Sequence, residues 1–135
     1  MDEIVKVKLF DLQLSKNYQG IINLVKEVTK TKPDDVYALT FAVDAYRNLG
    51  ENDKAIEILK HILSIDCMNI PAKLDLFDIL FKLCRFEEAK PLLEEIKTFD
   101  CNEVKKNKSY YDFASDLIEA YLLKKRSEEK IYDFD

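Results

Sequence analysis

Apolar side chains recur along most of the chain at steps of three and four, the spacing that gathers them on one side of an α-helix. Gly50 and Asn52 separate two such stripes, which suggests that one helix ends at Gly50 and that the Asn52 side chain caps the next helix. The stripes consist of Leu39, Ala42, Val43, Tyr46 and Leu49, and of Ala55, Ile56, Leu59, Ile62 and Leu63. The pattern predicts a helix, a turn and a second helix.

The same pattern returns with a period of 34 residues, which divides the chain into repeats at 2–35, 36–69 and 70–103. Four rows of equivalent positions are apolar in every repeat: Leu9, Val43 and Phe77; Leu12, Tyr46 and Leu80; Val25, Leu59 and Leu93; Val28, Ile62 and Ile96. Each repeat therefore predicts one helical hairpin. Stacked hairpins bury a core that a single hairpin could not bury alone.

Polar residues and prolines mark the expected helix starts. Asp34 or Asp35 can cap the first helix of the second repeat, and Asn69 can cap that of the third, with Pro71 in its first turn. Pro91 falls inside an expected helix. It predicts a kink unless that helix begins only about four residues earlier. In that case Pro91 lies in the first turn, where backbone N–H groups have no partner within the helix.

The period slips after residue 103. Residues 103–109 predict an inserted loop or a helix extension, and a shift of seven then restores the apolar stripe. We expect one further helix over about 110–126 that covers the end of the last repeat, because a terminal repeat lacks a neighbour on one side. For residues 127–135 we expect a short helix or a frayed end.

Composition favours this all-α reading and excludes several classes of protein. Two Gly and three Pro are too few for a many-stranded sandwich or barrel. Acids outnumber bases 26 to 21, and a net charge of −5 disfavours nucleic acid and anionic membranes as partners. No apolar run spans a bilayer, and the start at Met1 lacks a secretory signal. We expect one cytoplasmic domain over 1–135 with about seven helices.

Residues suited to catalysis or metal binding are sparse. Cys67, Cys84 and Cys101 are 17 positions apart, half the period, so we interpret them as buried structural thiols in turns on opposite edges of the stack. They lack the close pairing of zinc ligands. His61 has no recognisable catalytic partner. The sequence therefore predicts no catalytic residue, no metal and no cofactor, and the chain is not expected to be an enzyme.

With these residues the chain resembles the tetratricopeptide repeat family. The resemblance is carried by the repeat length and by Tyr18, Val25, Val28 and Pro33; Tyr46, Leu49, Gly50, Ala55, Leu59 and Ile62; Phe86, Ala89, Leu93 and Ile96. It implies a right-handed superhelical stack of antiparallel helix pairs. The family usually has a small residue where this chain has Leu9, Val43 and Phe77, and larger side chains there should alter the helix crossing angles.

The resemblance also implies a concave groove, lined by the first helix of each repeat, that binds a peptide or helix of a partner protein. Spacing along those helices predicts the groove-facing row: Lys6, Phe10 and Gln13; Tyr37, Thr40, Asp44 and Arg47; Leu74, Asp78 and Phe81, with Ser115 and Glu119 extending it. Aromatic rings mixed with both signs of charge suit an amphipathic segment. The alternative is that these rings pack against neighbouring helices.

We therefore expect a scaffold that binds another protein. One alternative is a secretion-type chaperone that holds a partner segment and dimerises; another is an enzyme or a regulatory subunit with an unrecognised site. Relatives that bind the acidic C-termini of heat-shock chaperones use a clamp of Lys, Asn and Arg. Lys6 matches that clamp, but Phe10, Phe41, Pro71 and Asp75 replace its other members, which argues against that ligand. The oligomeric state stays open, with a homodimer as one possibility.

Overall fold

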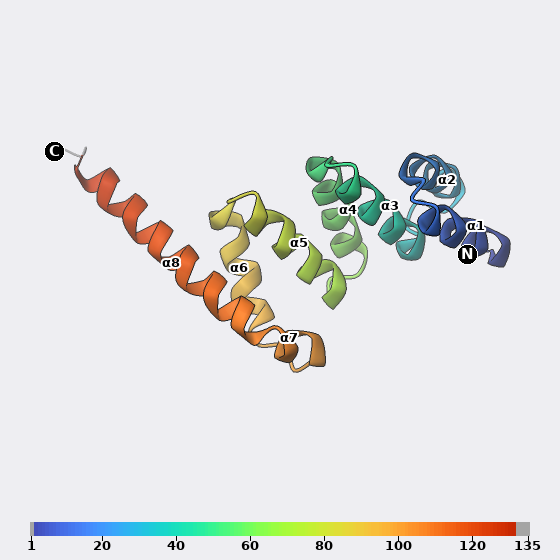
Figure 1. Cartoon of the computed structure of the whole chain (residues 1–135). Helices are drawn as coiled ribbons and strands as arrows, with labels where there is room; N and C mark the ends of the chain where they lie inside the picture. The colour runs from blue at the N-terminus through green and yellow to red at the C-terminus, as the bar shows by residue number, and fades with distance from the viewer. Residues whose placement is uncertain (1, 132–135) are drawn as a thin grey trace. The chain divides into compact units, whose positions relative to one another are not determined.

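The computed structural model describes residues 2–131, and every regular element there is an α-helix (Figure 1). The helices are α1 (Glu3–Leu14), α2 (Tyr18–Thr31), α3 (Val36–Asn48), α4 (Asn52–Ile65), α5 (Ile70–Lys82), α6 (Phe86–Ile96), α7 (Asn102–Lys106) and α8 (Lys108–Ile131). The prediction of an all-α chain is confirmed for this part. None of the described helices combines the length and the apolar content needed to cross a bilayer.

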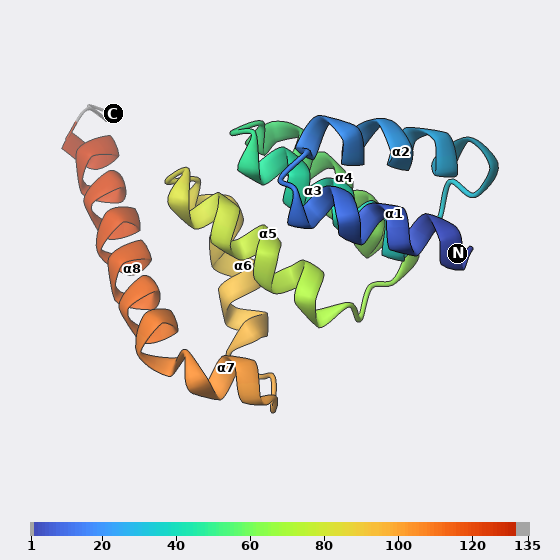
Figure 2. The same cartoon turned by 45° about the vertical axis from the view of Figure 1, so that its right-hand side comes forward.

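The chain forms two compact units that meet within α5. Unit 1 ends at Ala72 and unit 2 begins at Lys73. In unit 1 each helix packs on the next, α1 on α2, α2 on α3 and α3 on α4 (Figure 2). This packing between neighbours fits a helical repeat. The apolar rows found in the sequence supply its core, and Leu9, Ile21, Val25, Val43 and Leu59 are buried.

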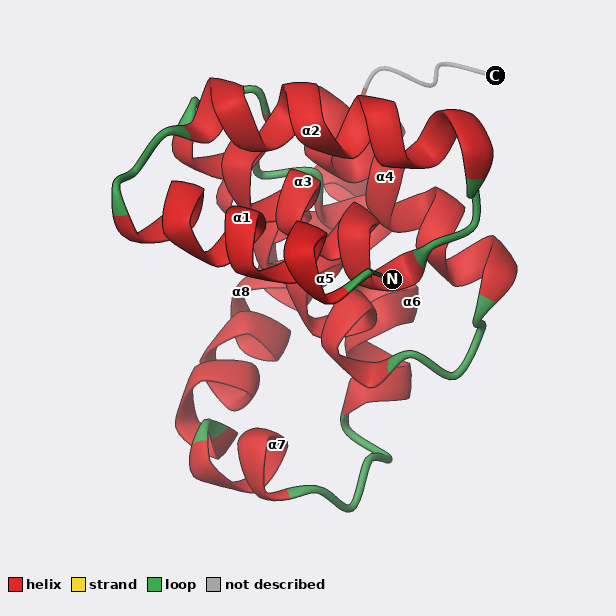
Figure 3. Ribbon diagram, turned by 90° about the vertical axis from the view of Figure 1, so that its right-hand side faces the viewer, coloured by secondary structure: helices red, strands yellow, loops and turns green. Residues whose placement is uncertain are grey.

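Helix starts follow the predicted period. The helices α2, α4 and α6 begin at Tyr18, Asn52 and Phe86, each 34 residues after the last, and α3 and α5 begin at Val36 and Ile70. Within unit 1, loops join consecutive helices (Figure 3). The pairs α1–α2 and α3–α4 fall within the residues 2–35 and 36–69, and the two helices of each pair pack on one another.

The same turn links the two helices of each pair. Lys16, Gly50 and Cys84 adopt left-handed backbone conformations, with φ of 57°, 75° and 58°. The following N–H donates to a carbonyl five residues back: Asn17 N to Leu12 O at 2.8 Å, Glu51 N to Tyr46 O at 2.9 Å and Arg85 N to Leu80 O at 2.9 Å. This bond defines the Schellman motif that ends a helix. The turn predicted at Gly50 is confirmed.

Helix caps agree with the sequence at two positions and differ at a third. The side chains of Asp35 and Asn69 accept hydrogen bonds from the amide three residues on, at 3.1 and 3.0 Å, as predicted. The prediction for Asn52 is wrong, since it is the first residue of α4 and Glu51 occupies the cap position without a side-chain bond. The Schellman turn at Gly50 leads directly into the next helix, which leaves Asn52 one residue too late.

Unit 2 is organised around aromatic rings. Phe77 is fully buried. Its ring centroid lies 5.6 Å from that of Phe81, 6.2 Å from that of Tyr110 and 5.9 Å from that of Tyr111. The helix α6 packs on α8. Pro91 lies five residues after the start of α6, beyond its first turn, and the helix continues to Ile96.

The C-terminal region is more helical than the sequence indicated. The segment 103–109, expected as a loop or extension, contributes to the short helix α7 and to the start of α8. The helix expected over 110–126 begins at Lys108 and reaches Ile131, so it includes much of the 127–135 segment; residues 132–135 lie outside the described part. The described residues thus form eight helices rather than about seven.

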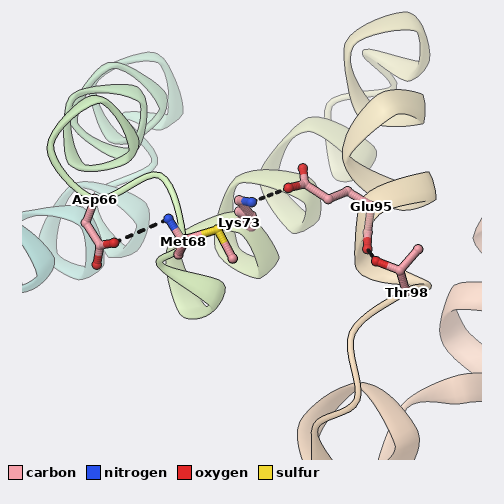
Figure 4. Close-up of polar contacts among 5 residues, drawn as sticks. All are labelled: Asp66, Met68, Lys73, Glu95 and Thr98. Atoms are coloured by element: carbon pink, nitrogen blue, oxygen red, sulfur yellow. Dashed lines mark hydrogen bonds and ion pairs between the residues drawn. The ribbon is translucent and has the colours of Figure 1, made fainter.

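A buried lysine joins α5 to the end of α6 in unit 2 (Figure 4). Lys73 is only 7% exposed, and its ammonium group pairs with the Glu95 carboxylate. Lys73 Nζ also lies 5.6 Å from the ring centroid of Phe99. Thr98 lies just after the end of α6, and its hydroxyl donates a hydrogen bond to the Glu95 carbonyl at 2.6 Å. The ion pair and the ring together compensate the ammonium group for its lost hydration.

Candidate interaction site

Side chains of α1 and α3 meet in three successive contacts on unit 1. Lys6 Nζ lies 5.4 Å from the ring centroid of Tyr37. The rings of Phe10 and Phe41 meet edge to face with centroids 5.4 Å apart, and Gln13 Nε2 donates to Asp44 Oδ2 at 3.2 Å. Each contact joins residues 31 positions apart, as expected for two helices in fixed register. We call these six residues the α1–α3 face.

Two rings of the α1–α3 face are accessible. Phe10 is 48% exposed and Tyr37 is 42% exposed, whereas Phe41 beneath them is buried. The ring centroids of Tyr37 and Phe41 are 5.4 Å apart. The Phe41 ring thus holds two exposed aromatic side chains in place. Lys6 provides a cation at one end of the face, and Asp44 provides a carboxylate at the other.

The remaining predicted residues of unit 1 lie on the same helix as Tyr37. The Thr40 hydroxyl is exposed and donates to the Val36 carbonyl at 2.8 Å, so its oxygen keeps lone pairs for an incoming donor. Arg47 is half-buried in the last turn of α3. Lys6 also pairs with Glu3 at 3.3 Å. The structure thus brings the predicted residues from α1 together with several of those from α3.

The predicted residues of unit 2 take part in contacts within that unit. Asp78 accepts a hydrogen bond from the Tyr110 hydroxyl at 2.9 Å and pairs with Lys82 at 3.0 Å. Phe81 is half-buried, with centroid distances of 5.6 Å to Phe86 and 5.9 Å to Tyr110. Leu74 is half-buried as well. For Phe81, these contacts agree with the alternative reading, that the ring packs against neighbouring helices.

The two positions that extended the row lie on α8. Ser115 is half-buried, and its hydroxyl accepts from Lys97 Nζ at 2.8 Å, a contact between the end of α6 and α8. Glu119 is exposed.

Phe41 was not part of the predicted row. It lies four residues after Tyr37 and three before Asp44, so the stripe used to select those two residues already contained it. The signal was present but ambiguous, because a Phe at such a spacing also suits the core. The structure shows that Phe41 belongs to the core and also supports the α1–α3 face, since its ring is buried and contacts the exposed rings of Phe10 and Tyr37.

The prediction of buried thiols is wrong. Cys67 and Cys84 are exposed, and Cys101 is half-buried. All three lie in turns or at a helix start, as expected, and such segments run over the surface. No group of three His, Cys, Asp or Glu side chains within residues 2–131 is placed to hold a metal ion.

Tyr111 in unit 2 and His61 in unit 1 are two titratable side chains whose surroundings have structural explanations. Burial raises the pKa of the Tyr111 hydroxyl, and the carboxylates of Asp78 and Glu103 raise it further. The phenol therefore stays neutral and contributes to packing. His61 is exposed, with its Nε2 3.5 Å from Asp34 Oδ1 on the loop that precedes α3.

A hollow of about 230 Å³ beside α8 is lined in part by charged side chains that already have partners. Lys125 pairs with Glu87, and Arg85 pairs with Glu88 at 2.7 Å. Such pairs neutralise one another, so they favour no particular charge in a ligand.

Comparison with protein-family models and with curated proteins finds no match for this sequence. The exposed rings of the α1–α3 face are the feature that we use as a guide to function.

Proposed function

We propose that the chain is a tetratricopeptide-like interaction module that binds a peptide or helix of another protein on the α1–α3 face. The observation that carries this proposal is the pair of exposed rings, Phe10 and Tyr37, held between a cation and a carboxylate. Exposed aromatic side chains on a rigid support are typical binding anchors, because they lose little conformational freedom on binding.

The repeated architecture supports the proposal. Helix starts and Schellman turns recur every 34 residues, and neighbouring helices of unit 1 pack on one another. In the proposed stack these pairs follow a right-handed superhelical course. The first helices then line one side, where a segment can lie across them.

The side chains of the α1–α3 face indicate how a ligand would bind. An apolar side chain of the ligand packs on the rings of Phe10 and Tyr37, and a carboxylate lies near Lys6. Asp44 and the Thr40 hydroxyl accept hydrogen bonds from donors of the ligand. No step requires a cofactor, and the proposed activity is binding without catalysis.

The test begins with a peptide library selected for binding to the wild-type chain, with affinities then measured by fluorescence anisotropy. We expect Phe10→Ala and Tyr37→Ala each to weaken binding of the selected peptides by about fivefold or more, because truncating an aromatic anchor typically costs above about 1 kcal/mol. Lys6→Glu should weaken the acidic peptides most.

The control is Met68→Ala, which removes an exposed apolar side chain from the α4–α5 turn of the same unit. It should leave the affinities unchanged. Peptides that bind the wild type, Phe10→Ala and Tyr37→Ala equally well would show that the α1–α3 face is not the binding site.

A further inference from the structure

The helix α8 carries an apolar stripe on the side that faces away from the core of unit 2. Phe113, Leu117 and Leu123 are 61%, 40% and 60% exposed, and Ala120 lies exposed between them. Steps of four, three and three place these residues on one side of the helix. We call them the α8 stripe. The opposite side of α8 buries Tyr111, Ala114 and Ile118.

The exposure of these side chains shows that no other helix among the described residues of unit 2 covers the α8 stripe. The helix is 24 residues long (Figures 1 and 2). Exposed apolar stripes of this kind are typical of surfaces that associate with another molecule. The charges beside the stripe indicate which molecule fits.

Within four residues of Ala120 on either side, the charges along α8 change sign. Asp116 lies four residues before Ala120, and Lys124 lies four residues after it. Both side chains are exposed, and neither forms an ion pair within the described residues 2–131. With a rise of about 1.5 Å per residue, each lies about 6 Å along the axis from Ala120.

This arrangement is complementary to itself when two copies of α8 run in opposite directions. A two-fold axis at Ala120 places Asp116 of one copy at the same level as Lys124 of the other, and it does so twice. The same axis places Leu117 of one copy near Leu123 of the other. The small Ala120 side chain at the centre allows the helices to approach closely.

From these observations we infer that the α8 stripe is a self-association surface, through which two copies of this chain pair antiparallel about Ala120. Apolar burial by the stripes provides the attraction, and the two Asp116–Lys124 pairs fix direction and register. A contact of two helices is small for a protein interface, so the dimer forms reversibly and depends on concentration. This inference is independent of the proposed peptide binding.

The first test measures mass by sedimentation velocity at protein concentrations from about 1 to 200 µM, the range expected for a small interface. The wild type should change from monomer to dimer across this range. Leu117→Asp and Leu123→Asp should remain monomeric, because each places a charge in the apolar contact of both copies. Leu14→Asp, at an exposed leucine of α1, is the matched control and should dimerise like the wild type.

The second test exchanges charges between copies. Asp116→Lys alone brings two lysines together at each end of the contact, and Lys124→Asp alone brings two aspartates together. Each variant should associate about tenfold more weakly than the wild type, since opposed like charges disfavour an interface. An equimolar mixture should dimerise again, because the lysine introduced in one variant then faces the aspartate introduced in the other, while the retained Asp116 faces the retained Lys124.

The controls Glu57→Lys and Lys60→Asp make the same changes of charge at exposed positions of α4 and should not alter dimerisation. Circular dichroism verifies that every variant keeps its helix content. The inference is overturned by a wild type that stays monomeric throughout, or by Leu117→Asp that dimerises normally. The antiparallel register about Ala120 is wrong if the mixture associates no better than the separate charge variants.

Discussion

At the scale of single residues, the three turns show how one backbone geometry is formed by different side chains. Lys16, Gly50 and Cys84 all have positive φ, yet only Gly50 lacks a Cβ atom. An L-residue in this conformation costs roughly 1–2 kcal/mol relative to the right-handed region. The Schellman hydrogen bonds and the packing of both helices therefore determine the turn, and Lys16 and Cys84 adopt it under strain.

We predict that Gly50→Ala lowers the free energy of unfolding by about 1 kcal/mol. An added Cβ would meet no atom within 4 Å, so the loss comes from the backbone conformation alone. The converse change, Lys16→Gly, should raise the free energy of unfolding by a few tenths to about 1 kcal/mol. Urea denaturation measures both, and equal stability of Gly50→Ala and wild type would contradict this account of the turn.

The Lys73–Glu95 pair predicts unequal effects for its two members. Glu95→Gln leaves a buried ammonium group without its counter-charge, and we expect a loss of about 1–3 kcal/mol. Lys73→Met removes the buried charge and leaves the half-exposed Glu95 to water, so stability should change by less than about 1 kcal/mol. Thermal unfolding compares the two variants, and a greater loss for Lys73→Met would contradict this interpretation.

At the scale of helices, period and stripe predicted most of the elements in unit 1. The period of 34 placed the helix starts, Asn69 was identified as a cap, and the cap of α3 was narrowed to Asp34 or Asp35, of which Asp35 forms the bond. Asn52 was wrongly predicted as a cap because side-chain chemistry alone does not show where a turn ends, and Glu51 holds that position. The helix α7 was missed because five residues give too little periodicity to detect.

The aromatic core of unit 2 supports a prediction at this scale. Phe77→Ala should lower the free energy of unfolding by about 3–5 kcal/mol, because it removes a fully buried ring that contacts rings from α5 and α8. The control Phe113→Ala, at an exposed Phe of α8, should change it by less than about 0.5 kcal/mol in dilute, monomeric protein. Equal losses in urea denaturation would contradict the assignment of Phe77 to the core.

At the scale of the whole molecule, the residues of the candidate site could be predicted only in part from the sequence. Spacing selected Phe10, Tyr37 and Asp44, which the structure places on one face of unit 1. Spacing gives the side of a helix but not the partner of each side chain. Asp78 and Phe81 therefore entered the predicted row, although Tyr110, distant in sequence, contacts both of them.

The exposed turns have a practical consequence for experiments on the intact chain. Cys67 lies on unit 1 and Cys84 on unit 2, and both thiols are accessible. With Cys101 replaced by serine, maleimide dyes can be attached at these two native positions without introducing any cysteine. Energy transfer between the dyes then reports the distance between the units, and its change on adding a selected peptide would show whether ligand binding bends the chain at α5.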